Sequence, residues 1–145
     1  MAEPEEIVVD NGARKLTLDE LGRTQPGMAR LMPEVGARMW KLWYAAQAGN
    51  WPLARYQLAE GVKLLEVGAF VRPKYRNTMA AFLADDLGPL SRAVEAGDWG
   101  SFEAAFVPMV ESANRYHDLY NKGFIRWRLP DTPPADLDLT PYPGS

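Results

Sequence analysis

The chain has 145 residues, 47% of them hydrophobic, and a formal net charge of −3. Its acidic isoelectric point, near 5.2, gives no electrostatic reason to expect nucleic acid as a partner. Because the chain has no cysteine, disulfides, thiolate metal sites and a thiol nucleophile are excluded. A chain of this size and apolar content is expected to form one domain around a single core.

The N-terminal sequence and the lengths of the apolar runs bear on location. Residues 1–6 are acidic and lack the basic and apolar regions of a signal peptide. No apolar run approaches the roughly 20 residues that a membrane-spanning helix needs. We therefore expect a cytoplasmic protein without a membrane partner.

The first part of the chain is expected to form an arm that precedes the helices. Residues 1–16 show no clear helix or strand periodicity. Thr17, followed three residues later by Glu20, has the pattern of a capping box and predicts a short helical turn. Beyond a break at residues 25–27, apolar residues at steps of three and four predict longer helices. These helices cover about 28–48, 51–67, 76–96 and 99–122.

Short connections between the predicted helices determine the expected fold. Gly49-Asn50 and Gly97-Asp98 each end one helix and cap the next, and Gly88-Pro89 is expected to divide the third helical segment. Connections this short favour antiparallel neighbours. We therefore predict an all-α protein in which residues 17–130 form an antiparallel four-helix bundle. The proline-rich residues 131–145 are expected to form a trailing strap without regular structure.

The only histidine of the chain is the first candidate for a functional residue. His117 lies on the apolar stripe of the last predicted helix, and Met39 lies on that of the first. In an antiparallel bundle these stripes face each other. A lone inward histidine is often only a hydrogen-bonded core residue, and a methionine on such a stripe often only fills space. Spacing alone leaves both interpretations open, and a single histidine predicts no multi-histidine metal site.

Residues 41–58, KLWYAAQAGNWPLARYQL, resemble a segment of the small four-helix c-type cytochromes of the cytochrome c prime type. Members of that family carry K-L-W-F-A-x-x-x-x-N-W-x-L-A-x-Y-E-L at this place. They end in a C-N-A-C-H motif, which is followed by F-I and a proline. Residues 113–117, ANRYH, stand in the place of that motif here. The resemblance covers about residues 17–130 and implies the four-helix fold.

The departures from the family pattern concern the cofactor. Ala113 and Tyr116 stand where the family has the two cysteines that bond haem, so covalent attachment is impossible. Met39 stands where the family has a histidine, and Gln57 replaces a glutamate, whereas Glu60 matches. The resemblance therefore implies the fold, but it does not by itself imply haem or electron transfer.

The first of three functional interpretations is a haem-free bundle whose former cofactor cavity binds a small apolar or aromatic molecule, with or without a carboxylate. Such a protein could be a cofactor-independent lyase, decarboxylase, isomerase or hydratase, with His117 as the acid–base group and Arg38 holding an anionic group. The candidate catalytic residues are His117, Arg38, Glu60 and Tyr116. The candidate ligand-binding residues are Met39, Leu42, Trp43, Tyr56, Met109, Ala113 and Tyr120.

The other two interpretations differ in what the bundle holds. In the second, the protein binds a non-covalent haem b, with His117 and Met39 as the axial pair. In the third, it is a non-catalytic interaction protein whose surface tryptophans and proline-rich tail contact a partner. A homo-oligomer is also expected. The sequence leaves the ligand, the reaction and the presence of haem b open.

Overall fold

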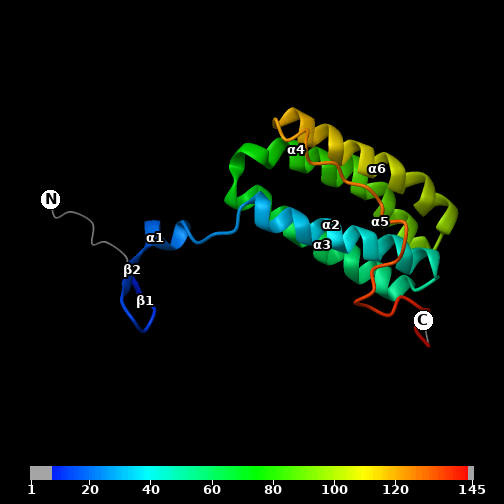
Figure 1. Ribbon diagram of the computed structural model, residues 1–145, viewed down its shortest axis with the longest axis horizontal. Coiled ribbons are helices and arrows are strands. Elements are labelled where there is room, and N and C mark those ends of the chain that lie inside the picture. Colours follow the sequence, from blue (N-terminus) through cyan, green and yellow to red (C-terminus); the bar gives the residue numbers. More distant parts are fainter. Residues whose placement is uncertain (1–7, 144–145) are drawn as a thin grey trace.

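The computed structural model describes residues 8–143 and is mostly helical, with one small two-stranded sheet. Figure 1 shows the long helices gathered together, with the sheet standing apart from them on an N-terminal arm. Residues 1–7 of the predicted arm and residues 144–145 of the predicted tail lie outside the described residues. Within residues 8–143, no helix is both long enough and apolar enough to cross a membrane.

The described part of the arm is a β-hairpin, which the sequence periodicity did not reveal. Strand β1, Val8–Asp10, pairs antiparallel with strand β2, Lys15–Thr17. In the turn, the Asn11 side-chain oxygen accepts two backbone N–H groups, and Gly12 takes a φ of 86°. Strands of three residues are too short to show the alternation on which a strand prediction depends.

The capping box predicted at Thr17 is confirmed. Helix α1, Leu18–Gly22, begins with the Thr17 hydroxyl accepting from the Glu20 N–H at 3.1 Å. In return, the Glu20 carboxylate accepts from the Thr17 N–H at 2.9 Å. The two bonds satisfy N–H groups that the start of a helix otherwise leaves unpaired.

Helices α2, Met28–Gln47, and α3, Trp51–Val71, form the first long hairpin. Gly49 ends the connection from α2 with a φ of 80°. The Asn50 side chain then accepts from the N–H of Leu53 at 3.2 Å, so Asn50 caps α3 as predicted. Helix α3 is four residues longer than predicted, because nothing stops it before the chain reaches the residue that precedes Pro73.

The third helical stretch is continuous but irregular. It comprises the 3₁₀ turn η1 (Pro73–Tyr75), helix α4 (Arg76–Ala81), the π-helical turn η2 (Phe82–Asp86) and helix α5 (Leu87–Ala96). The predicted division at Gly88-Pro89 is wrong, since both residues lie inside α5. The irregularity lies in η2 instead. Pro89 has no backbone N–H to donate to a carbonyl of the preceding turn. The wider π turn accommodates this missing bond and makes space for the proline ring.

Helix α6, Trp99–Leu119, is the last regular element. Gly97, with a φ of 63°, ends α5, and the Asp98 carboxylate caps α6 by accepting from the Ser101 hydroxyl at 2.6 Å and from its N–H. The helix ends three residues before the predicted boundary, because Asn121 adopts a left-handed φ of 59°.

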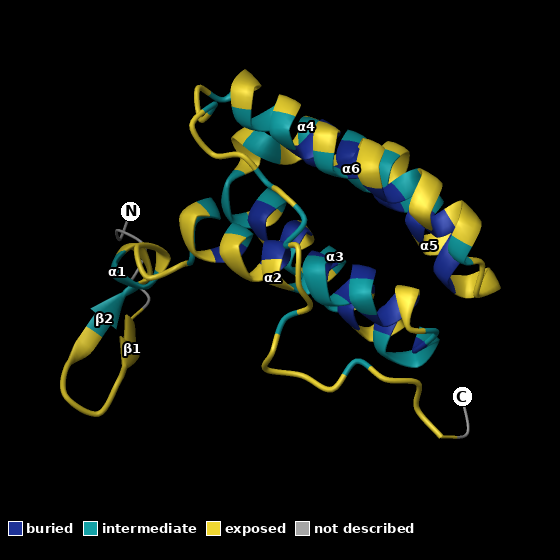
Figure 2. Ribbon diagram, turned by 45° about the vertical axis from the view of Figure 1, so that its right-hand side comes forward, coloured by how far each residue is buried: buried dark blue, intermediate teal, exposed yellow. Residues whose placement is uncertain are grey.

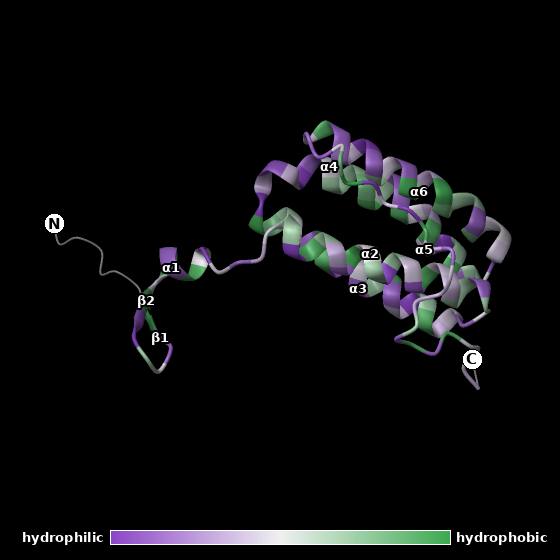
Figure 3. Cartoon of the chain, viewed as in Figure 1, coloured by the Kyte–Doolittle hydropathy of each residue, from purple (hydrophilic) through white to green (hydrophobic). Residues whose placement is uncertain are grey.

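The helical stretches form two antiparallel hairpins that lie side by side, α2 with α3 and α4–η2–α5 with α6 (Figure 1). Figure 2 shows buried residues on the faces that the hairpins turn toward each other, and Figure 3 shows polar residues along the outer edge of α6. Aromatic rings fill the centre of the core. The ring of Trp43 lies 4.9 Å from that of Phe106 and 5.0 Å from that of Trp99.

After α6 the chain follows an irregular path along α2 to the far end of the helical unit (Figure 1). The Tyr44 hydroxyl of α2 donates to the Pro130 carbonyl at 2.5 Å. At the far end, the Asn50 side-chain amide donates to the Thr140 carbonyl at 2.7 Å. Side chains of the first hairpin therefore hold residues 130–140 in place.

Candidate small-molecule site

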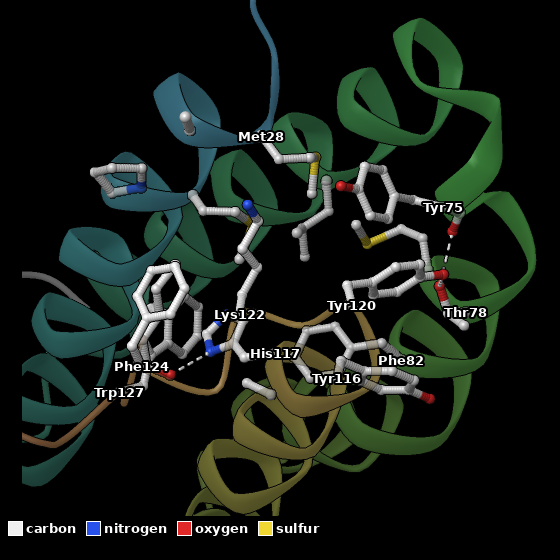
Figure 4. Close-up of a pocket in the computed structure, with 17 residues that line it drawn as sticks. Met28, Tyr75, Thr78, Phe82, Tyr116, His117, Tyr120, Lys122, Phe124 and Trp127 are labelled. Atoms are coloured by element: carbon white, nitrogen blue, oxygen red, sulfur yellow. Dashed lines mark hydrogen bonds between the residues drawn. The ribbon is translucent and has the colours of Figure 1, made fainter.

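A cavity of about 480 Å³ lies at the end of the helical unit where α2 and α4 begin and α6 ends. The segment that follows α6, residues 122–127, closes one side of it (Figure 4). This volume lies in the range of small-molecule sites, and the walls are mostly apolar and aromatic, as in such sites. The lining residues are Met28, Ala29, Met32, Pro33, Leu65, Tyr75, Thr78, Met79, Phe82, Ala113, Tyr116, His117, Tyr120, Lys122, Phe124, Ile125 and Trp127.

His117 lies on the last turn of α6 and is half-buried in the cavity wall. Its Nδ1 lies 3.0 Å from the carbonyl oxygen of Ile125. Because a carbonyl oxygen only accepts, Nδ1 carries the proton, and Nε2 of the neutral ring is left as an acceptor. Burial lowers the pKa of His117, the bond to Ile125 and the carboxylate of Asp118 partly oppose this, and the charge of Arg126 adds to it. The ring is therefore neutral at pH 7.

Hydroxyl groups gather on the opposite side of the cavity from His117 (Figure 4). The Thr78 and Tyr120 hydroxyl oxygens are 2.6 Å apart, and Thr78 can also donate to the Tyr75 carbonyl at 3.1 Å. The Tyr75 and Tyr120 rings meet edge to face, with centroids 4.6 Å apart. This side of the cavity therefore offers hydroxyl oxygen atoms that can accept further hydrogen bonds, while their hydrogens already have acceptors in the protein.

Ala113 and Tyr116 both line the cavity. The ring of Tyr116 meets that of Phe82 edge to face at 5.9 Å. Figure 4 shows the Tyr116 hydroxyl pointing away from His117. Burial, and then the carboxylates of Asp86 and Asp85, raise the pKa of Tyr116, so its hydroxyl stays protonated at neutral pH.

Asn114 holds the segment that closes the cavity. Its side-chain oxygen accepts from the Trp127 N–H at 2.7 Å, and its amide donates to the Trp127 carbonyl at 3.0 Å. Next to it, Arg126 pairs with the Asp118 carboxylate at 2.5 Å. These bonds place the Trp127 ring against His117, with centroids 6.0 Å apart. Two side chains of α6, Asn114 and Asp118, therefore hold the closing segment against the helix.

Among residues 8–143, Lys122 is the one lining residue that carries a formal charge at pH 7. It follows the left-handed Asn121, and its N–H donates to the His117 carbonyl at 2.7 Å. No Asp or Glu side chain from the described part of the chain lines the cavity. Lys122 therefore places one formal positive charge on the His117 side of the cavity.

Three candidate residues of the predicted site lie outside the cavity. Arg38 donates to Gln57 Oε1 at 3.1 Å and pairs with Glu34 at 3.0 Å. Tyr56 is 55% exposed and lies beneath the Arg38 guanidinium, 5.7 Å from it. Glu60 pairs with Lys63 at 2.8 Å, which lowers the pKa of Glu60. These groups cluster on the outer face of the first hairpin, because they occupy the flank of the apolar stripe rather than its centre.

Four further candidates are core residues that do not line the cavity. They are Met39, Leu42, Trp43 and Met109. They miss the cavity because they lie at a different position along the helix axes. Trp43 meets Phe106, which precedes His117 by about 16 Å of helix axis at about 1.5 Å per residue. A shared stripe determines which face a residue lies on, but not its level.

The fit of a haem group to this site depends on its possible ligands. His117 could offer Nε2, since Nδ1 is occupied by a carbonyl, an arrangement that favours metal ligation. The predicted partner Met39 does not line the cavity, so the His117–Met39 pair does not fit. Thioethers of Met28, Met32 and Met79 do line it. Among residues 8–143, no three His, Asp or Glu side chains gather as a metal site.

Sequence reasoning missed several residues of the cavity wall. For the third helical region, which contains Tyr75 and Thr78, the sequence did not indicate which side faces the site. Lys122 and Trp127 lie in the irregular segment after the last helix. A sequence signal for the closing segment does exist, since a lysine and two aromatic residues follow His117 closely.

Comparison of the chain with protein-family models, with curated proteins and with solved structures gave no match.

Proposed function

We propose that this protein binds a small aromatic or apolar molecule, without a resident cofactor, in the cavity beside His117. The observation that supports this most is the composition of the cavity. Apolar and aromatic walls enclose a few polar groups, which is the usual arrangement of a small-molecule site. No buried polar side-chain atom among the described residues lacks a hydrogen-bond partner.

His117 is the residue to which we assign chemistry, if the protein is an enzyme. Its neutral ring has Nε2 available as a base at pH 7. The Thr78–Tyr120 hydroxyl pair supplies facing oxygen atoms that can accept a hydrogen bond. This set suits proton transfer to and from a bound carbon acid, and thus a cofactor-independent lyase or isomerase. Arg38 and Glu60 have no part in it, because they lie outside the cavity.

The relation to the four-helix cytochromes is part of the proposal. The order of the two hairpins and the position of the cavity beside residues 113–117 agree with a cytochrome-like bundle that has lost its haem. In this interpretation, the space of the former cofactor now receives a smaller organic molecule. We also propose a cytoplasmic location, as the acidic N-terminal sequence suggests.

Blocking the cavity tests the proposal. Ala29 lines the cavity and is exposed, so Ala29→Trp fills the space without disturbing the core. The matched control is Arg30→Trp, at the next exposed position of α2, which does not line it. Calorimetry with phenol and 2-naphthol should show binding to the wild type and to Arg30→Trp, and none to Ala29→Trp. Binding that is absent from the wild type, or equal in all three proteins, would contradict the proposal.

Non-covalent haem b is a second candidate, favoured by the three methionines that share the cavity with His117. Bound haem would supply redox chemistry or gas binding at this site. Purified protein mixed with haem should then develop a strong Soret band that His117→Ala abolishes. The same band in Met39→Ala would show that Met39 is not the second ligand.

A homo-oligomer is a third proposal, and it concerns the outer face of α3. Tyr56, Val67 and Phe70 recur there at helical spacing and are strongly exposed. An apolar stripe of this kind suits contact with a second copy. Phe70→Glu should lower the mass that light scattering measures if this face joins two copies, and a wild-type protein of monomer mass would contradict the proposal.

A further inference from the structure

The cavity also has a preferred ligand charge. Resting on the function proposed above, we infer that the ligand is an aromatic monoanion whose carboxylate is held by Lys122. The ring of the ligand then lies among the aromatic walls, and its far end reaches the Thr78–Tyr120 hydroxyl pair. Lys122 thereby takes the anion-binding role that the sequence assigned to Arg38.

The charges of the wall favour an anion over a neutral or cationic ligand. Among the lining residues that the structure describes, Lys122 is the single formal charge, and none has an acidic side chain. His117 adds no second charge, because burial lowers its pKa. The Lys122 side chain is exposed at the rim of the cavity, where one positive group matches one negative group on the ligand.

Lys122 is free to meet such an anion. Within residues 8–143, no carboxylate lies within ion-pairing distance of its ammonium group. The ammonium group lies over the ring of Phe124, whose centroid is 5.9 Å from Nζ. By contrast, Arg126 in the same segment is already paired with Asp118. The left-handed turn at Asn121 gives Lys122 its place in the wall.

The walls favour a flat ring between the two polar ends. Rings contribute much of the lining, from Tyr75, Phe82, Tyr116, Tyr120, Phe124 and Trp127. Figure 4 shows Lys122, His117 and Phe124 on one side and Tyr75, Thr78 and Tyr120 on the other. Aromatic side chains gain from edge and offset contacts with another ring, which an alkyl chain does not offer. A ring with a carboxylate at one end and a hydrogen-bonding group at the other therefore fits best.

The test compares two probes of nearly the same shape, 4-hydroxybenzoate and its neutral analogue 4-hydroxybenzamide. Calorimetry at pH 7 and low salt should show the acid binding to the wild type about two- to fivefold more tightly than the amide, as expected for an exposed ion pair. The preference should shrink when salt is raised. Lys122→Met should remove it, and Lys122→Arg should keep it.

The control is Lys74→Met. Lys74 is exposed, and its carbonyl lies near the same hydroxyl pair, but its side chain does not line the cavity. This variant should keep the preference for the acid. Equal binding of acid and amide to the wild type, or a loss of both probes alike in Lys122→Met, would overturn the assignment of Lys122 while the proposed binding function stands. If neither probe nor phenol binds to the wild type, the proposed function fails as well.

Discussion

Asn114 and Trp127 are joined as two paired strands would be, by one hydrogen bond in each direction between the Asn114 side-chain amide and the Trp127 backbone. A single side chain thus replaces a partner strand and satisfies both backbone groups of Trp127. The bond pair fixes the segment that closes the cavity onto the helix that carries His117. The shape of the site therefore depends on a residue that does not line it.

Asn114→Ala should weaken both the fold and the site. Loss of the two bonds is expected to lower the free energy of unfolding by about 1–3 kcal/mol, because the backbone groups of Trp127 lose their partners. Ligand affinity should fall as well, since the wall is no longer held. Urea unfolding and calorimetry measure the two effects. Asn114→Asp keeps the acceptor and loses the donor, and should lie between wild type and alanine; an alanine variant with wild-type stability and affinity would contradict this role.

His117 should make the protein less stable in mild acid. Its folded-state pKa is lowered from the ordinary value of about 6.5, mainly by burial. Below that ordinary value the unfolded chain binds a proton that the folded chain does not, so stability falls as the pH decreases toward the folded-state pKa. The difference in unfolding free energy between wild type and His117→Gln should therefore change across this window. Parallel pH profiles for the two proteins would show that His117 does not titrate in this way.

Two glycines of α3 provide a matched test of which methionine belongs to the site. A Cβ added at Gly68 would meet the sulfur of Met28 at 2.7 Å, and one added at Gly61 would meet the terminal methyl of Met39 at the same distance. Met28 lines the cavity and Met39 does not. Gly68→Ala should therefore change ligand affinity, and Gly61→Ala should leave it unchanged. In both variants, the helix gains about 0.5–1 kcal/mol of intrinsic preference, which offsets part of the crowding.

Arg38 should matter for stability rather than for binding. It donates to the side-chain oxygen of Gln57, which is buried. Arg38→Ala leaves that oxygen without its donor and should lower the unfolding free energy by about 1–3 kcal/mol, with ligand affinity unchanged. Glu60→Gln removes only a surface ion pair and should leave stability nearly unchanged. A large loss of ligand affinity in either variant would show that this outer cluster belongs to the site after all.

The sequence predicted the long helices well where an apolar stripe and a capping residue agreed. Asn50 and Thr17 have side chains that accept backbone N–H groups, so their positions as caps follow from local chemistry alone. The hairpin of the arm and the π turn before Pro89 depend on hydrogen bonding that periodicity does not record. Local signals therefore predicted where helices begin, but not how an irregular stretch continues.

The candidate site was predicted in part, and the division has a geometric cause. Ala113, Tyr116, His117 and Tyr120 are spaced by three or four residues on one helix, so they reach the same cavity. Predicting that Met39 lies outside the cavity would require the alignment of two helices along their axes, which an apolar stripe does not give. Lys122 and Trp127 required the path of an irregular segment, which depends on long-range bonds such as those of Asn114.

The binding of the closing segment by a side chain rather than by a strand has a consequence for hydrogen exchange. The Trp127 N–H has a protein acceptor without belonging to any helix or sheet. Its exchange with solvent therefore requires only the local release of this segment, and not the unfolding of the helices. The exchange rate of this one amide measures how often the cavity opens, and a ligand that fills the cavity should slow it while amides in the middle of α2 keep their rates.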